Sequence, residues 1–204
     1  MSNVNMWAIE DSFYSEDLKI ICGVDEAGRG PLAGPVCAAA VILPKHLELP
    51  GLTDSKKLTD KKRRELFPLI QEQAIDYGIG FATAQEIAEI NILQATFLAM
   101  QRALDQLSVK PDLALIDGNR QKDFGVPTRT VVKGDSLSAN IAAASILAKV
   151  TRDNLMEEMA KEYPQYGFEI HKGYGTKAHY AALREFGACP IHRATFLKKF
   201  YGNQ

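Results

Sequence analysis

Hydrophobic and polar residues follow one another in blocks along the chain, and the apolar blocks predict five short strands. Residues 19–25 and 36–43 are apolar runs on either side of a glycine- and proline-rich loop, a separation typical of antiparallel neighbours. In residues 75–84, bulky side chains alternate with small ones, as in a half-buried strand. Two further apolar runs, residues 113–116 and 128–132, complete the set.

Segments with helical spacing lie between and after these strands. Residues 56–73 predict a polar helix, and apolar residues recur at nearly helical spacing in residues 85–107. Residues 136–163 predict one long helix, and its first thirteen residues are uncharged, so this half should be buried on most sides. Two shorter helices are expected at 176–186 and 192–200. The order of elements predicts an α/β fold with a five-stranded mixed sheet flanked by helices.

The length and composition predict a single globular domain. The chain has 204 residues, of which 46% are hydrophobic, so it can bury a full core as one unit. We expect residues 1–17 to form a flexible N-terminal leader and residues 18–204 to form the domain. Within it, residues 164–204 are expected to be a helical C-terminal extension.

Charge and cysteine content are those of a globular protein with reduced thiols. Charged residues make up 24% of the chain and the net charge is −1, which is typical of a globular protein and does not exclude local basic patches for nucleic acid. The three cysteines are widely spaced and form no C-x-x-C pair, which indicates reduced thiols. The chain shows neither a signal peptide nor an apolar run long enough for a membrane span, so we expect a soluble cytoplasmic protein.

Carboxylates stand at the ends of three predicted strands, each directly after an apolar run. They are Asp25 with Glu26, Asp117 and Asp135. A single acid in such a position is more often a turn former or a helix cap, and Asp135 could cap the long helix. Four acids at one edge of a sheet would repel one another unless a divalent cation were bound among them. An all-carboxylate set favours Mg²⁺ or Mn²⁺ over zinc, and two such ions would suit phosphodiester cleavage.

Three other features fit a nucleic-acid substrate. Gly28, Arg29 and Gly30 directly follow the first acid pair, where glycine lets the backbone approach a ligand and arginine suits phosphate. Residues 54–64 hold six basic residues against two acids, and we assign Lys56 among them to substrate binding, although such a run is usually a solvated helix face. Tyr174 lies between two glycines, where it could pack in a turn or against a sugar.

The same glycine loop also imitates a dinucleotide-binding fingerprint. Gly28, Gly30 and Ala33 have its spacing and follow a predicted strand. However, Pro31 and the next strand leave no room for the helix that would bind a pyrophosphate. Two carboxylates beside a pyrophosphate would also repel it, which argues against a dinucleotide enzyme.

Seven short motifs along the chain match those of a known protein family, and they stand in the same order. They are Asp-Glu-Ala-Gly-Arg-Gly-Pro at 25–31, Asp-Ser-Lys-Lys-Leu at 54–58, Ile-Asp-Gly-Asn at 116–119, Lys-Gly-Asp at 133–135, Ala-Ala-Ser-Ile-Leu-Ala-Lys-Val-Thr-Arg-Asp at 143–153, Gly-Tyr-Gly-Thr at 173–176 and Pro-Ile-His-Arg at 190–193. Together they strongly resemble bacterial ribonuclease HII, over about residues 19 to 200.

This resemblance implies a ribonuclease H-like fold with additional C-terminal helices. It implies that the family's four acids, which are catalytic and bind metal, are Asp25, Glu26, Asp117 and Asp135, with Asp25 as the bridging ligand. The Gly28–Gly30 motif would contact the 2′-hydroxyl and phosphate of a ribonucleotide. Tyr174 would pack against the following deoxyribose. We therefore expect a bulky side chain at Gly28 or Gly30 to damage recognition more than the fold.

The expected function is an endoribonuclease that uses two Mn²⁺ or Mg²⁺ ions. It would hydrolyse the RNA strand of RNA–DNA hybrids and cut 5′ of single ribonucleotides in duplex DNA, leaving 3′-hydroxyl and 5′-phosphate ends. Such an enzyme would serve ribonucleotide excision and RNA primer removal, and we expect a monomer; the sequence does not determine any contact with a replication clamp. Two alternatives are another metal-dependent nuclease on the same fold and a non-catalytic nucleic-acid binding module, which would gain nothing from an acidic pocket.

Overall fold

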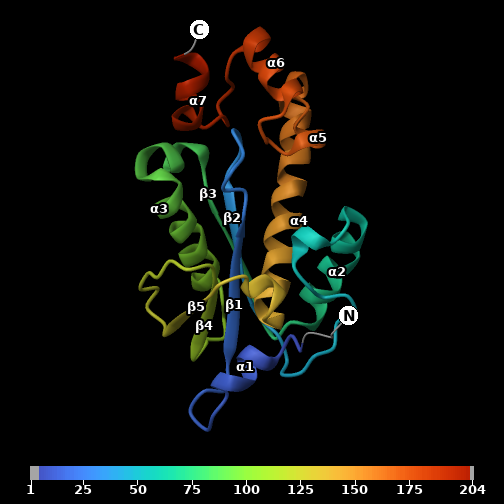
Figure 1. The fold of residues 1–204 in the computed structure, drawn as a ribbon, viewed down its shortest axis with the longest axis vertical. Coiled ribbons are helices and arrows are strands. Elements are labelled where there is room, and N and C mark those ends of the chain that lie inside the picture. The colour runs from blue at the N-terminus through green and yellow to red at the C-terminus, as the bar shows by residue number, and fades with distance from the viewer. Residues whose placement is uncertain (1–4, 203–204) are drawn as a thin grey trace.

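A five-stranded mixed sheet lies at the centre of the computed structural model, which describes residues 5–202 (Figure 1). The strands are β1 (Ile21–Ala27), β2 (Val36–Ile42), β3 (Asp76–Ala82), β4 (Leu113–Asp117) and β5 (Thr128–Val131), in the spatial order β3-β2-β1-β4-β5. The pairs β1–β2 and β2–β3 are antiparallel, whereas β1–β4 and β4–β5 are parallel. The predicted mixed sheet and the antiparallel pairing of its first two strands are confirmed.

Long helices cover both faces of this sheet, α3 (Ala84–Asp105) on one side and α4 (Ala139–Glu162) on the other (Figure 1). Along β2, Ala38 and Ala40 belong to the core beneath α3, while Ala39 and Val41 belong to the core beneath α4. The strand is therefore apolar at every position, because both of its faces are buried. Helix α2 (Asp60–Gln73) packs on the outside of α4.

The first turn of α4 lies directly on β1 because Gly23 has no side chain. A β-carbon at Gly23 would overlap the backbone of Asn140 and Ile141. The Asn140 side chain also accepts a hydrogen bond of 2.8 Å from the backbone N–H of Leu43, just after β2. This close attachment brings the residues just before α4 next to the middle of β1.

Two predicted helices begin later than expected, and the difference matters for the site. Helix α4 starts at Ala139 rather than at 136, and its cap is Ser138, which accepts from the N–H of Ile141. Asp135 is therefore not the helix cap; it lies in a separate 3-10 turn, Gly134–Ser136. Helix α2 similarly starts at Asp60, after another 3-10 turn, Ser55–Lys57.

The described part of the predicted leader is folded against the domain rather than flexible. Residues Ala8–Phe13 form helix α1, and Glu10 within it is fully buried. The Glu10 carboxylate accepts hydrogen bonds from the Ser138 hydroxyl at 2.6 Å and from the Asn140 backbone N–H at 3.1 Å. These contacts correct the prediction for residues 5–17, whereas residues 1–4 lie outside the described part.

The C-terminal extension consists of short helices around a small core of its own. They are the 3-10 turn Pro164–Tyr166, α5 (Phe168–His171), α6 (Lys177–Phe186) and α7 (Ala194–Tyr201), at the upper end of Figure 1. Tyr166, Phe168, Leu183 and Leu197 are buried there against Leu32. The two predicted helices α6 and α7 are confirmed, while the four-residue α5 was not predicted.

Two further expectations concern membranes and thiols. Within residues 5–202, the structure has no helix with the length and apolar character needed to cross a bilayer. Cys22, Cys37 and Cys189 are all free, and the first two are buried in the core, as predicted.

Candidate active site

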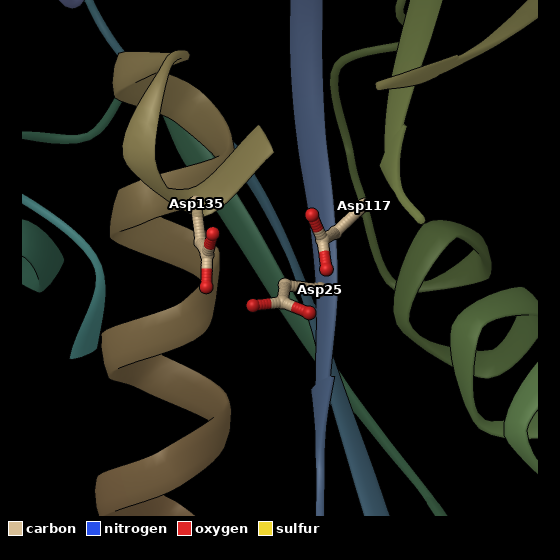
Figure 2. Close-up of side chains that lie close together, drawn as sticks. All are labelled: Asp25, Asp117 and Asp135. Carbon is tan, nitrogen blue, oxygen red and sulfur yellow. The ribbon is translucent and has the colours of Figure 1, made fainter. Parts of the chain in front are cut away.

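Three of the four predicted acids meet at one place beside the sheet (Figure 2). Asp25 lies on β1, Asp117 is the last residue of β4 and Asp135 lies in the turn before α4. One carboxylate oxygen from each lies within 4.8 Å of the others. Because Val24 of β1 is paired with Ile116 of the parallel strand β4, the two residues that follow them lie side by side.

The three aspartates are held in an environment that penalises their negative charge. Asp25 and Asp135 are buried, at 2% and 4% exposure, and Asp117 is partly buried. Burial is the main cause that raises the pKa of Asp25 well above its ordinary range, and the Glu26 and Asp117 carboxylates raise it further. Burial and the Asp135 carboxylate likewise raise the pKa of Asp117.

One buried oxygen of this cluster also has no donor. Asp25 Oδ1 accepts from the backbone N–H of Glu26 at 2.7 Å, whereas Asp25 Oδ2 has no hydrogen-bond partner in the described part of the chain. Leaving such an oxygen unpaired costs free energy that a hard cation with oxygen ligands would recover. The donor set therefore fits a divalent metal ion, and it is the only such group of three that residues 5–202 contain.

Glu26 is adjacent to this group but does not belong to it in the structure. Consecutive strand residues point to opposite faces, and the Glu26 carboxylate accepts from Arg29 Nη1 at 3.3 Å instead. Burial raises the pKa of Glu26, and the charge of Arg29 partly opposes this rise. The structure thus brings Asp25, Asp117 and Asp135 together and leaves Glu26 at their margin.

A cavity of about 210 Å³ adjoins the acids and contains every predicted substrate-binding residue. It is lined by Gly28, Arg29, Gly30, Lys56 and Tyr174, and also by Glu26, Ala27, Ser55, Ser145 and Lys149. The Lys56 ammonium lies 3.2 Å from Asp135 Oδ2. Its burial opposes the charged form, but Asp25 and Asp135 outweigh this and raise the pKa of Lys56. This lysine therefore carries its charge at the boundary between the acids and the cavity.

Sequence reasoning did not assign the two α4 residues of this cavity. Ser145 lies 2.6 Å, Oγ to Oγ, from Ser55, and Lys149 lies one helical turn further on. Both belong to the motif at 143–153, which was recognised only as part of a family resemblance. A periodicity argument along α4 could have pointed to them, because Ser145 is one of two polar residues in its uncharged, buried half and Lys149 is the first charged residue after it.

Two buried arginines, which sequence reasoning also missed, hold the glycine loop. Arg193 donates to the carbonyls of Gly28, Arg29 and Gly34 at 2.6, 2.9 and 2.9 Å. Arg152 donates to the carbonyls of Pro35, Ala33 and Lys172. Burial lowers the pKa of Arg193 to about 9. Six carbonyl groups thus compensate two buried guanidinium groups, and the loop is fixed before any ligand binds.

The two glycines of the motif have different roles in this structure. Gly28 has φ +92°, and a β-carbon there would overlap the Arg152 side chain. At Gly30 a β-carbon would meet only Tyr174 Cε1, at 3.7 Å. The expectation that both positions serve recognition more than the fold is therefore wrong for Gly28. The loop leads into strand β2 and not into a helix, which removes the basis for a dinucleotide site.

Comparisons with known proteins agree with this geometry. A sequence model of the family described as Ribonuclease HII matches residues 22–199. The ribonuclease HII of Endomicrobium trichonymphae is 56% identical over 193 residues, which cover 94% of this chain and 92% of that protein. The crystal structure of the ribonuclease H2 from Pyrococcus horikoshii OT3 has a TM-score of 0.72 and 27% identity, over 91% of this chain and 100% of that one. The PCNA:RNase HII complex from Archaeoglobus fulgidus matches in fold, with a TM-score of 0.71 and 24% identity over 86% of this chain and 94% of that one.

Proposed function

This chain belongs to the ribonuclease HII family and is a ribonuclease H endonuclease, and from that premise we propose how its site selects and cuts nucleic acid. The substrates would be RNA–DNA hybrids and DNA duplexes with single ribonucleotides, cut 5′ of the ribonucleotide to leave 3′-hydroxyl and 5′-phosphate ends. The observation that carries the proposal is the three-aspartate cluster beside a cavity lined by the glycine loop. This activity would serve ribonucleotide excision and RNA primer removal.

The acids would hold the metal ions of the reaction. Asp25, Asp117 and Asp135 fit a divalent cation of the Mg²⁺ or Mn²⁺ type, with Glu26 completing the set for two ions when substrate is present. Ions bound there would activate water and stabilise the leaving oxygen of the phosphodiester. All these residues come from one chain, so a monomer would suffice.

The residues around the cavity would orient the substrate. Arg29 and Lys149 place positive charge along its wall, and Lys56 does so beside Asp135, where the backbone phosphates would lie. The 2′-hydroxyl is both donor and acceptor, and it distinguishes RNA from DNA. The backbone of Gly28 to Gly30, held by Arg193, offers rigid polar groups that could read it.

A duplex with one ribonucleotide tests the proposal. We expect the protein with Mg²⁺ or Mn²⁺ to cut this duplex on the 5′ side of the ribonucleotide and to leave an all-DNA duplex of the same sequence intact. The reason is that the backbone N–H groups of the loop would lose the 2′-hydroxyl as their partner, and such losses discriminate strongly. Denaturing gel analysis of end-labelled strands, with product ends mapped enzymatically, measures this. Equal cutting of both duplexes would indicate the alternative of a general metal-dependent nuclease.

Tyr174 offers a second test, directed at the junction. Tyr174 is 45% exposed and lines the cavity. We expect Tyr174→Ala to lower kcat/KM on the single-ribonucleotide duplex by roughly tenfold or more, because stacking contacts of this kind contribute about 1–3 kcal/mol. Tyr174→Phe, which keeps the ring, should retain most of the activity. As a matched control, Tyr201→Ala removes another exposed tyrosine, on α7, and should not change the rate. Unchanged rates in Tyr174→Ala would contradict a substrate role for Tyr174.

A further inference from the structure

A chain of buried imidazoles lies behind the loop that carries Tyr174. His179 on α6 is fully buried and His192, just before α7, is 7% exposed. Their Nε2 atoms are 3.0 Å apart. His179 Nδ1 lies 2.9 Å from the carbonyl oxygen of Tyr174, and His192 Nδ1 lies 2.9 Å from the backbone nitrogen of Cys189.

These contacts determine which nitrogen carries each proton. A carbonyl oxygen only accepts, so His179 Nδ1 must carry a hydrogen and donate it to Tyr174. The Cys189 N–H only donates, so His192 Nδ1 accepts, and its longer 3.3 Å approach to the Cys189 carbonyl carries no proton. His192 Nε2 therefore holds a hydrogen and donates it to His179 Nε2. All of these hydrogen bonds form together only when both rings are neutral. A second proton on His179 would place two N–H donors against each other at Nε2, and a second proton on His192 would do so at the Cys189 N–H.

The surroundings favour these neutral rings. Burial lowers the pKa of His179, and burial together with the neighbouring His179 lowers the pKa of His192 to about 4. A third imidazole, His171, stacks on His179 with ring centroids 4.5 Å apart and accepts from the N–H of Gly173 at 3.2 Å. His171 thus binds the backbone just before Tyr174, and His179 binds the carbonyl of Tyr174 itself.

The segment that carries His192 is also paired with the glycine loop. His192 forms an isolated antiparallel bridge with Ala33. On either side of it, the Gly34 N–H donates to the Ile191 carbonyl at 2.9 Å and the Arg193 N–H donates to the Leu32 carbonyl at 2.8 Å. Its side chain then reaches Tyr174 through His179. The imidazole pair therefore connects the two parts of the cavity wall, Gly28–Gly30 and Tyr174, which are far apart in the sequence.

We propose that His179 and His192 are positioning residues that hold Tyr174 at a fixed place relative to the glycine loop and so determine the preference for a ribonucleotide–deoxyribonucleotide junction. This inference rests on the proposed role of Tyr174. Neither histidine lines the cavity, so both act only through the backbone that they bind. Loss of one hydrogen bond in the chain would leave the ring of Tyr174 on a less well-defined backbone, while the aspartates remain undisturbed.

Asparagine and glutamine substitutions test the chain bond by bond. The asparagine amide lies near the place of Nδ1 and the glutamine amide near that of Nε2. His179→Asn therefore keeps the donor to the Tyr174 carbonyl but loses the acceptor for His192, whereas His179→Gln keeps that acceptor and loses the donor to Tyr174. At the other position, His192→Gln keeps the donor to His179 and His192→Asn loses it, so His192→Gln leaves both bonds between His192 and Tyr174 in place.

The measurement is the ratio of kcat/KM on a single-ribonucleotide duplex to kcat/KM on an RNA–DNA hybrid. We expect this ratio to fall about tenfold in His179→Asn, His179→Gln and His192→Asn, each of which breaks one of these two bonds, and to stay within about threefold in His192→Gln. The ratio is independent of the fraction of active enzyme, so a merely structural role would not change it. His46→Gln, at an exposed histidine near α1, serves as the matched control.

The outcomes separate this inference from the proposed function. If Tyr174→Ala lowers the ratio and all four histidine variants leave it unchanged, the role of the histidines is overturned and that of Tyr174 remains. An equal fall of the ratio in His192→Asn and His192→Gln would also overturn it. If Tyr174→Ala leaves the ratio unchanged, the proposed junction role of Tyr174 itself fails. Should a variant at His179 not fold, the pair at His192 still gives the decisive comparison, and an unchanged ratio in any folded variant that breaks one of the bonds overturns the inference.

Discussion

Asp25→Asn is expected to reduce cleavage of every substrate by on the order of a thousandfold or more, while leaving the protein folded. The amide is nearly isosteric with the carboxylate but removes the charge at the centre of the three-aspartate cluster. Asp117 and Asp135 would then hold a cation far more weakly. Steady-state cleavage of an RNA–DNA hybrid, over a range of Mg²⁺ and Mn²⁺ concentrations, measures the loss.

The same substitution should raise stability when metal is removed. Burial raises the pKa of Asp25 above its value in the unfolded chain, so the stability present at low pH is lost as the pH rises through the folded-state pKa. At neutral pH with a chelator, Asp25→Asn should therefore melt at a higher temperature than the parent protein. This difference should disappear below about pH 4, where the unfolded carboxylate is also protonated.

Metal addition provides the complementary measurement. Mg²⁺ or Mn²⁺ should raise the melting temperature of the parent protein, because a ligand that binds only the folded state stabilises it, and should do so much less in the variant. Asp17→Asn, at an exposed aspartate, is the matched control and should behave like the parent. Retained activity in Asp25→Asn, or an unchanged response to metal, would contradict the metal-site interpretation.

The strands and the acid cluster could be predicted from the sequence because each depends on local patterns. Apolar runs bounded by glycine marked β1, β2 and β4, and acids that follow the apolar runs of two neighbouring parallel strands lie close together. Asp25 and Asp117 illustrate this, since pairing of Val24 with Ile116 places them side by side. The position of Asp135 was harder to predict, because Ser138 competes with it as the helix cap.

Features that depend on distant partners could not be predicted in this way. Glu10 reads as an exposed residue of a loose leader, yet it is buried because Ser138 and Asn140 donate to it. Arg152 and Arg193 belong to two motifs to which the sequence assigned no role, yet backbone carbonyls of the glycine loop accept hydrogen bonds from both. In each case a polar side chain is buried by groups that only the folded chain brings together, so neither composition nor spacing reveals it.

Gly28→Ala is expected to lower the stability of the protein, whereas Gly30→Ala is expected to impair recognition of the substrate and to leave stability unchanged. At Gly28 the positive φ is strained for alanine by about 1–3 kcal/mol, and the new methyl group would displace Arg152 from the carbonyls that it binds. We expect this variant to lose roughly 10 °C of melting temperature or to fail to fold. At Gly30 the methyl group is in ordinary contact with Tyr174 alone, so the melting temperature should stay within about 2 °C.

Gly30→Ala should instead impair the choice of substrate. Its methyl group would stand in the cavity between the loop backbone and Tyr174, where the ribose is expected to bind. Cleavage of the single-ribonucleotide duplex should therefore fall by tenfold or more, in a protein whose circular dichroism and melting curve match the parent. Combining Gly28→Ala with Arg152→Ala relieves the overlap but not the backbone strain, and it also removes the bonds that Arg152 donates, so no recovery of stability is expected. If Gly30→Ala were as unstable as Gly28→Ala, or cut the ribonucleotide as fast as the parent, the division between a structural glycine and a substrate-facing glycine would be refuted.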